Sequence, residues 1–82
     1  MFNPETANVL PNGAQIVQRK CVGSAWVWLA YQEGQFQPYV TWVSNAEDPG
    51  GTYWGHYYGN LSKALVDYHG RINEQWPKNT CG

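Results

Sequence analysis

The feature that most constrains this chain is the spacing of its β-prone runs, which follow one another with short connections. Runs rich in β-branched and aromatic residues predict strands over residues 14–21, 24–32, 36–44 and 53–58. A parallel crossover needs about a dozen residues or more, usually as a helix, and no interval here offers one. Consecutive strands should therefore pair as antiparallel neighbours.

A helix signal follows the last run directly. Asn60 or Ser62 is suited to cap a helix N terminus. Gly70 weakens the helical pattern, and Trp76-Pro77 marks its stop. The apolar residues that recur at helical spacing are Leu61, Ala64, Leu65, Tyr68, Ile72 and Trp76. The order β-β-β-β-α predicts an α+β fold: an antiparallel meander of three to four strands with one C-terminal helix packed on one face.

The 82 residues predict a single domain spanning 1–82. Residues 1–13 lack a periodic pattern and should form an irregular N-terminal segment, and residues 77–82 should form a frayed tail. The stretch from Asn45 to Gly51 is rich in turn-forming residues and predicts a loop.

Aromatic residues are more numerous than so small a core needs. Five Trp, six Tyr and two Phe make up 16% of the chain, and each buried ring removes about 150–250 Å² from water. The helix covers one sheet face, which we expect to hold Ala25, Val27, Leu29 and Val43. The opposite face should then present the partner-binding residues Trp26, Trp28, Trp42, Trp54, His56 and Tyr58. This assignment depends on strand register, because a slip of one residue exchanges the two faces.

Three interpretations of that second face compete. In the first, the face docks a protein or a second copy of the chain, since Tyr and Trp commonly anchor such surfaces. In the second, it binds a small molecule, with the rings stacking on sugars or nucleosides. In the third interpretation the N-terminal segment folds over the face and hides it through Phe2, Val9 and Leu10.

Charge and spacing exclude several other classes. The net charge is −1 and Arg19-Lys20 is the only basic pair, which argues against binding a nucleic-acid backbone. The cysteines and histidines lack metal-ligand spacing, so we predict no metal and no cofactor. No orienting acid stands in a recognisable motif near His56 or His69, so we predict a protein that is not an enzyme; a hydrolase using His56 is the weakest alternative.

The chain also lacks targeting signals. No apolar stretch approaches the ~20 residues needed to span a bilayer, and no secretory signal precedes the first strand. We therefore expect a cytoplasmic protein without membrane contact. Cys21 and Cys81 should then stay reduced, although a disulfide between them is the alternative in an oxidising compartment.

Between Ala25 and Arg71 the chain resembles a group of small proteins encoded by bacteriophages, plasmids and integrated elements of bacteria. The matching residues are Trp28-Leu29-Ala30-Tyr31, Pro38-Tyr39-Val40-Thr41-Trp42, Tyr53-Trp54-Gly55-His56-Tyr57, Leu61, Ala64, Asp67-Tyr68 and Arg71. The group brings no activity and no catalytic residues. The resemblance implies a mobile-element setting, in which small proteins often bind host machinery as inhibitors of restriction or CRISPR systems.

These observations predict a non-enzymatic protein-interaction module, in its sharpest form a phage or mobile-element inhibitor of a bacterial defence system. The alternative is a domain that binds a small molecule, saccharide or nucleoside on its aromatic sheet face.

Overall fold

Four strands form one antiparallel sheet, and one helix follows them. The computed structural model describes residues 2–23, 25–45 and 47–75, without the side chains at 49–50, 52–54 and 74–75. The elements are β1 (Gln15–Val22), β2 (Ala25–Tyr31), β3 (Tyr39–Asn45), β4 (Asp48–Tyr58) and α1 (Leu61–Gln75), and the strands lie side by side in chain order. The predicted α+β meander with a C-terminal helix is confirmed.

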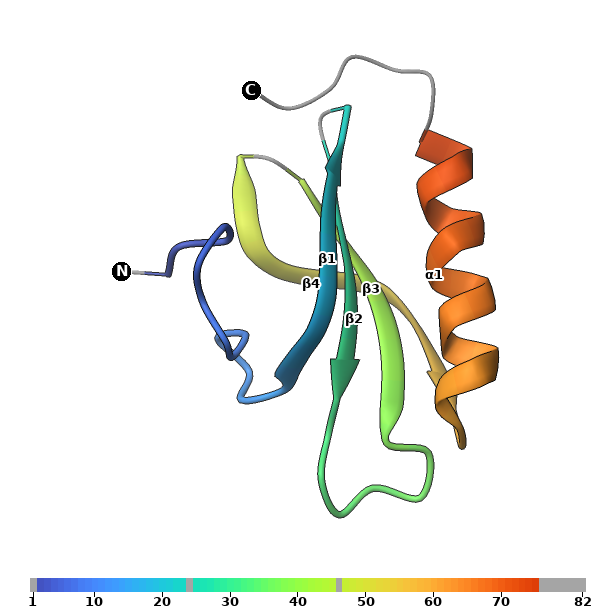
Figure 1. The fold of residues 1–82 in the computed structure, drawn as a ribbon. Coiled ribbons are helices and arrows are strands. Elements are labelled where there is room, and N and C mark those ends of the chain that lie inside the picture. The colour runs from blue at the N-terminus through green and yellow to red at the C-terminus, as the bar shows by residue number, and fades with distance from the viewer. Residues whose placement is uncertain (1, 24, 46, 76–82) are drawn as a thin grey trace.

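The molecule has three layers, as Figure 1 shows with the sheet seen nearly edge-on. The helix α1 covers one face of the sheet, and the segment before β1 crosses the other. The strand β4 bends strongly along its length, and its pairing with β3 is interrupted on both sides of Val43. Such irregularities raise local twist and re-aim side chains, so the faces of β4 cannot be assigned by simple alternation.

The layer beneath α1 is aliphatic at its centre. Val27 and Leu29 of β2 are fully buried against Ala64 and Tyr68 of the helix, as the apolar stripe predicts. The side-chain oxygen of Asn60 accepts a hydrogen bond from the Lys63 amide at 2.9 Å, which identifies the N-cap. The helix continues through position 70 to Gln75 rather than ending at the glycine.

The layer on the opposite face is built around two indoles. Trp28 and Trp42 are directly opposite each other on β2 and β3, and Leu10 and Ala14 from the N-terminal segment close over them. Trp28 Nε1 donates to Ser44 Oγ at 2.9 Å, and that hydroxyl in turn donates to the Gly51 carbonyl. The polar edge of the buried indole is therefore satisfied inside the protein.

The predicted loop at residues 45–51 is wrong. Asn45 is the last residue of β3, Asp48 is the first of β4, and the two are paired across the sheet. The turn-forming residues Pro49 and Gly50 lie within the strand β4, where pairing with β3 is irregular. Bulged stretches tolerate proline and glycine, which explains how a turn-like composition is accommodated.

Candidate functional site

The predicted open aromatic face is for the most part a covered core. Trp28 is 0% exposed and Trp42 is 4% exposed. Trp26 is partly buried and stacks on Trp28 with ring centroids 5.4 Å apart. The ring of Phe2 lies 5.9 Å from that of Trp28. The expectation that Trp28 and Trp42 lie exposed is wrong, because the N-terminal segment folds over them as in the third interpretation.

Two more of the predicted residues lie on the opposite side of the sheet. The register pairs His56 with Thr41 and Tyr58 with Tyr39, and these are the β3 residues that face α1. The prediction that His56 and Tyr58 share a face with Trp42 is therefore wrong by one residue of register. The side chain of Trp54, the sixth predicted residue, lies outside the described part of the structure.

His56 instead joins a polar cluster between β4 and α1, which we call the His56–Asp67 cluster: Thr41, His56, Tyr58, Lys63, Asp67 and Arg71. The carboxylate of Asp67 is its centre. Asp67 Oδ2 lies 3.0 Å from His56 Nδ1, accepts a hydrogen bond from Thr41 Oγ1 at 2.5 Å, and lies 3.2 Å from Arg71 Nε. Three elements thus converge on one oxygen atom.

Local structure explains this convergence. Thr41 and His56 are paired residues on adjacent strands, so their side chains rise together toward the helix. Asp67 and Arg71 are four residues apart on α1 and therefore lie on one side of it. Thr41 is fully buried and Arg71 nearly so, whereas the side chain of His56 is 53% exposed. The cluster therefore has a buried base and a solvent-facing imidazole.

Electrostatics keep Asp67 ionised. Burial alone raises the pKa of its carboxyl, but hydrogen bonds from Thr41 and His56 and the positive charge of Arg71 lower it more, so the pKa lies below its ordinary value. Burial, followed by the negative charge of Asp67 and a hydrogen bond to it, raises the pKa of Tyr58. Tyr58 therefore stays a neutral donor beside a charged acceptor.

The cluster can orient a proton-transfer group. With Asp67 ionised, the Nδ1 of a neutral His56 carries the hydrogen, so Nε2 holds the lone pair. A shallow hollow of about 330 Å³ adjoins it, lined by Tyr58, Lys63, Val66 and Asp67. His56 is not among the residues that line this hollow, and the Nε2 of its half-exposed imidazole can accept a hydrogen bond or a proton from a group that approaches it from solvent.

Sequence reasoning missed the role of Asp67 and Thr41 toward His56. Asp67 and Arg71 are four residues apart, a spacing that by itself indicates no more than an exposed ion pair on a helix. The signal that links Asp67 to His56 is the strand register, which no local pattern in the sequence specifies.

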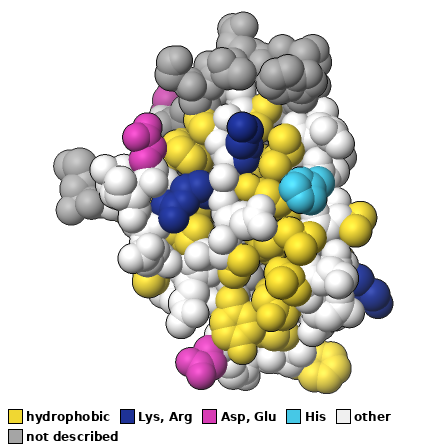
Figure 2. Space-filling model, viewed as in Figure 1, with side chains coloured by type: hydrophobic (Ala, Val, Ile, Leu, Met, Phe, Trp, Pro, Cys, Tyr) yellow, Lys and Arg dark blue, Asp and Glu magenta, His cyan; other side chains and the backbone are white. Residues whose placement is uncertain are grey.

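A second surface follows the outer edge of β1. Figure 2, in the same view as Figure 1, shows hydrophobic side chains over the middle and lower part of this face, with Lys or Arg side chains among them in its upper half. Val9 and Val17 are 47% and 43% exposed, and Leu65 and Ile72 of α1 are partly exposed. The helix packs mainly over β2, β3 and β4, which leaves the β1 side of the aliphatic layer less covered.

Within the described part of the chain, the outer edge of β1 is paired at its start, where the Ile16 amide donates to the Asn8 carbonyl at 2.9 Å, and no strand lies against residues 17–20 on that side. Among the described residues, one isolated bridge, between Val9 and Gln15, lies outside the four strands. A bulge interrupts the pairing with β2 between Ile16 and Gln18. Arg19 reaches the Pro4 carbonyl at 3.0 Å, and Lys20 is exposed. The edge thus combines apolar side chains with two cations.

Cys21 departs from the expected reduced thiol, because it is disulfide-bonded. The sequence holds one other cysteine, Cys81, which lies outside the described residues. Of the residues that the structure describes, no three His, Cys, Asp or Glu side chains gather into a potential metal site. In the same part of the chain, no helix has the length and apolar character needed to cross a bilayer.

Comparison with known proteins gives no relative. No protein-family model matches the chain, and no curated protein or solved structure is significantly similar to it.

Proposed function

We propose that this chain is a non-enzymatic protein-interaction module that docks its partner along the β1 edge. The observation that carries the proposal is the coincidence of an open sheet edge with a group of exposed apolar side chains (Figure 2). An edge strand presents unpaired backbone donors and acceptors, and a partner strand can extend the sheet there. Apolar side chains beside it add area that becomes buried on association.

The charges of the edge favour a foreign partner over a second copy. Arg19 and Lys20 are adjacent on β1, and antiparallel pairing of β1 with its own copy would bring like charges close together. Like charges directly opposite on paired strands are destabilising. The fitting occupant is an extended segment with an apolar residue facing Val17 and a carboxylate facing Lys20.

In its sharpest form, the partner is a component of a bacterial defence system, such as a restriction or CRISPR complex. The support is the resemblance to small mobile-element proteins, together with a size that suits a stoichiometric binder. The cytoplasmic location predicted from the sequence belongs to the same proposal, and the disulfide at Cys21 counts against that location because disulfides are rare in the cytosol.

The experiment is a capture assay with matched variants. Val17→Glu and Lys20→Glu change the β1 edge. Val66→Glu is the matched control, because it introduces the same charge on α1, away from that edge, at a residue that is 75% exposed. Partners captured from bacterial lysate are identified by mass spectrometry, and circular dichroism checks folding. Loss of the same protein with both edge variants but not with Val66→Glu is expected; equal capture by all would contradict the proposal.

Self-association is measured in parallel by light scattering. The charge argument predicts that the wild-type chain stays monomeric at micromolar concentration. A dimer that Lys20→Glu strengthens would show instead that the edge pairs with its own copy.

A ligand face of stacked aromatic rings is the less favoured alternative. Trp28 and Trp42, which would supply its platforms, are buried under Leu10. A stacked ligand would have to displace the N-terminal segment, at the cost of opening a packed core layer.

The second candidate function is hydrolysis with His56 as general base, and the orientation of His56 by Asp67 favours it. It predicts an activity that is abolished in His56→Ala. Asp67→Asn should lower the rate while the protein stays folded, because the wrong tautomer becomes available. A panel of esters and phosphodiesters, assayed with both variants, decides whether this activity exists.

A further inference from the structure

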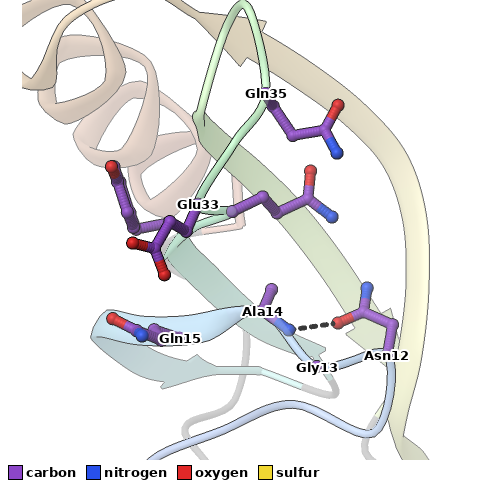
Figure 3. Close-up of a pocket in the computed structure, with 8 residues that line it drawn as sticks. Asn12, Gly13, Ala14, Gln15, Glu33 and Gln35 are labelled. Carbon is purple, nitrogen blue, oxygen red and sulfur yellow. Dashed lines mark hydrogen bonds between the residues drawn. The ribbon is translucent and has the colours of Figure 1, made fainter.

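A polar hollow of about 280 Å³ lies where the turn before β1 meets the loop between β2 and β3. It involves neither the His56–Asp67 cluster nor the open part of the β1 edge. Figure 3 shows Asn12 and Gln35 on one side of the hollow and Gln15 and Glu33 on the other. Its volume is close to the lower end of ordinary ligand pockets, about 300 Å³, so it suits a ligand of one ring.

The backbone around the hollow is held in place by the protein itself. The chain turns at Gly13 and Gly34, which adopt positive φ angles of 93° and 86°. The backbone amide of Gln32 donates to the Pro38 carbonyl at 2.7 Å, closing the base of the β2–β3 loop. Gln15 and Tyr31 are paired residues of β1 and β2. The backbone therefore needs little reorganisation to receive a ligand, whereas the exposed side chains of Asn12, Glu33 and Gln35 become ordered on binding.

The lining is rich in carboxamides. Asn12, Gln15, Gln32 and Gln35 each offer an oxygen acceptor and two N–H donors. Asn12 Oδ1 accepts a hydrogen bond from the backbone amide of Ala14 at 3.0 Å. Because this bond holds the oxygen of the carboxamide against the backbone, the NH₂ group points the other way and can donate to a ligand (Figure 3). Paired donors and acceptors complement hydroxyl groups, because each hydroxyl also both donates and accepts.

The charges and the apolar content exclude other ligand classes. Glu33 is the one charged residue among those that line the hollow, so phosphates and carboxylates meet no cation there and one anion. The amide-rich wall is poorly suited to an apolar ligand, which would leave its donors and acceptors desolvated. Tyr31, whose ring packs 5.2 Å from that of Tyr39, adds one apolar surface next to the amides.

We propose that this amide hollow binds a neutral monosaccharide. The ring hydroxyls pair with the carboxamides of Asn12, Gln32 and Gln35, Glu33 accepts from a further hydroxyl, and the Tyr31 ring lies against the carbon face of the sugar. The hollow is open to solvent, and binding is accordingly weak, in the millimolar range. The site is independent of the docking proposal and can hold or fail without it.

The test is a titration followed by nuclear magnetic resonance of ¹⁵N-labelled protein, which resolves the side-chain amides directly. The probes are glucose, galactose, mannose and N-acetylglucosamine. Glycerol, an acyclic polyol, is the control ligand. Saturable shifts of the Asn12, Gln32 and Gln35 side-chain amides with at least one hexose, and none with glycerol, are expected. No saturable shift with any hexose, or equal shifts with glycerol, would overturn the proposal.

Variants separate the hollow from general surface effects. Gln32→Leu and Gln35→Leu each remove one carboxamide while keeping a side chain of similar size, and each should weaken binding about tenfold, the usual order for one lost hydrogen bond. Gln18→Leu is the matched control, on an exposed position of β1 that does not line the hollow. Unchanged affinity in both loop variants, or equal loss in Gln18→Leu, would also contradict the assignment.

Discussion

The indole of Trp42 packs directly against the backbone of Gly55, in the space that a side chain at position 55 would fill. A Cβ atom placed on Gly55 would come within 2.6 Å of Trp42 Nε1 and 3.2 Å of the Tyr57 ring. Trp42 is 4% exposed, so its indole has no room to retreat, and the half-exposed ring of Tyr57 contacts it edge-on at 6.4 Å between centroids. The glycine in this aromatic strand is thus a packing requirement of the indole layer.

Gly55→Ala should therefore destabilise the fold. Overpacking in a close-packed core typically costs about 1–3 kcal/mol, and we expect a loss of free energy of unfolding in that range by urea denaturation. Gly59→Ala is the matched control, because a Cβ there meets nothing within 4 Å. If the two variants were equally stable, the close approach of Gly55 to Trp42 would be wrong.

Asp67 should make stability depend on pH in the acid range. Its pKa in the folded state lies below the ordinary value of 3.8, so the unfolded chain binds the proton more readily. The stabilisation is fully present above the unfolded-state pKa and is lost as the pH falls through the folded-state pKa. The free energy of unfolding should decline with falling pH below about 4, and more steeply than in Asp67→Asn.

Glu47→Gln provides the control for that experiment, since Glu47 is an exposed carboxyl in the turn between β3 and β4. Urea unfolding over a series of acid pH values measures the slope for each protein. The same slope in wild type and Asp67→Asn would show that Asp67 is not held ionised by its neighbours.

Tyr68 should limit stability in alkali. Burial raises its pKa from 10.0 to about 12, although the positive charge of Arg19 partly opposes the shift. The stabilisation from its neutral phenol is fully present below pH 10.0 and is lost as the pH rises toward 12. Tyr68→Phe should therefore unfold at a higher alkaline pH than wild type, as followed by circular dichroism.

Tyr57→Phe is the comparison for the alkaline transition. Tyr57 is 49% exposed, so this substitution should leave the pH midpoint of unfolding unchanged. A wild-type transition that coincides with that of Tyr68→Phe would mean that another group sets the alkaline limit.

The disulfide at Cys21 predicts the absence of titratable thiol in the folded protein. With two cysteines in the chain, a thiol reagent under denaturing conditions should detect none before reduction. Closing a long loop by a disulfide stabilises by about 2–4 kcal/mol, so reduction should lower the melting temperature. Two thiols per chain without reductant would refute the bond and would suit the predicted cytoplasmic location, where disulfides are rare.

Local chemistry was sufficient for most of the fold. The β-branched runs, the short connections and the Asn60 cap act over a few residues, and they predict the order and pairing of the elements. The tight connection from Asn45 to Asp48 was missed because the proline and glycines that follow Asp48 resemble a loop, although an irregular strand also accommodates them.

The candidate site depended on long-range geometry that no short pattern carries. Whether His56 faces Trp42 or Thr41 is decided by one residue of register between β3 and β4. Whether Trp28 is exposed or covered is decided by Phe2 and Leu10, which belong to an N-terminal segment without a periodic apolar pattern. Because the sequence pattern of each is compatible with either outcome, the chemistry of His56 became visible only with the structure.

The contact of Phe2 and Leu10 with the indole layer has a practical consequence. A shortened protein that begins at Gly13 would keep every strand and the helix, yet it would present Trp28 and Trp42 to water. Non-specific association of the shortened molecules through these exposed rings would then be mistaken for a physiological complex. Binding studies on this protein should accordingly retain its first dozen residues and carry any affinity tag at the other terminus.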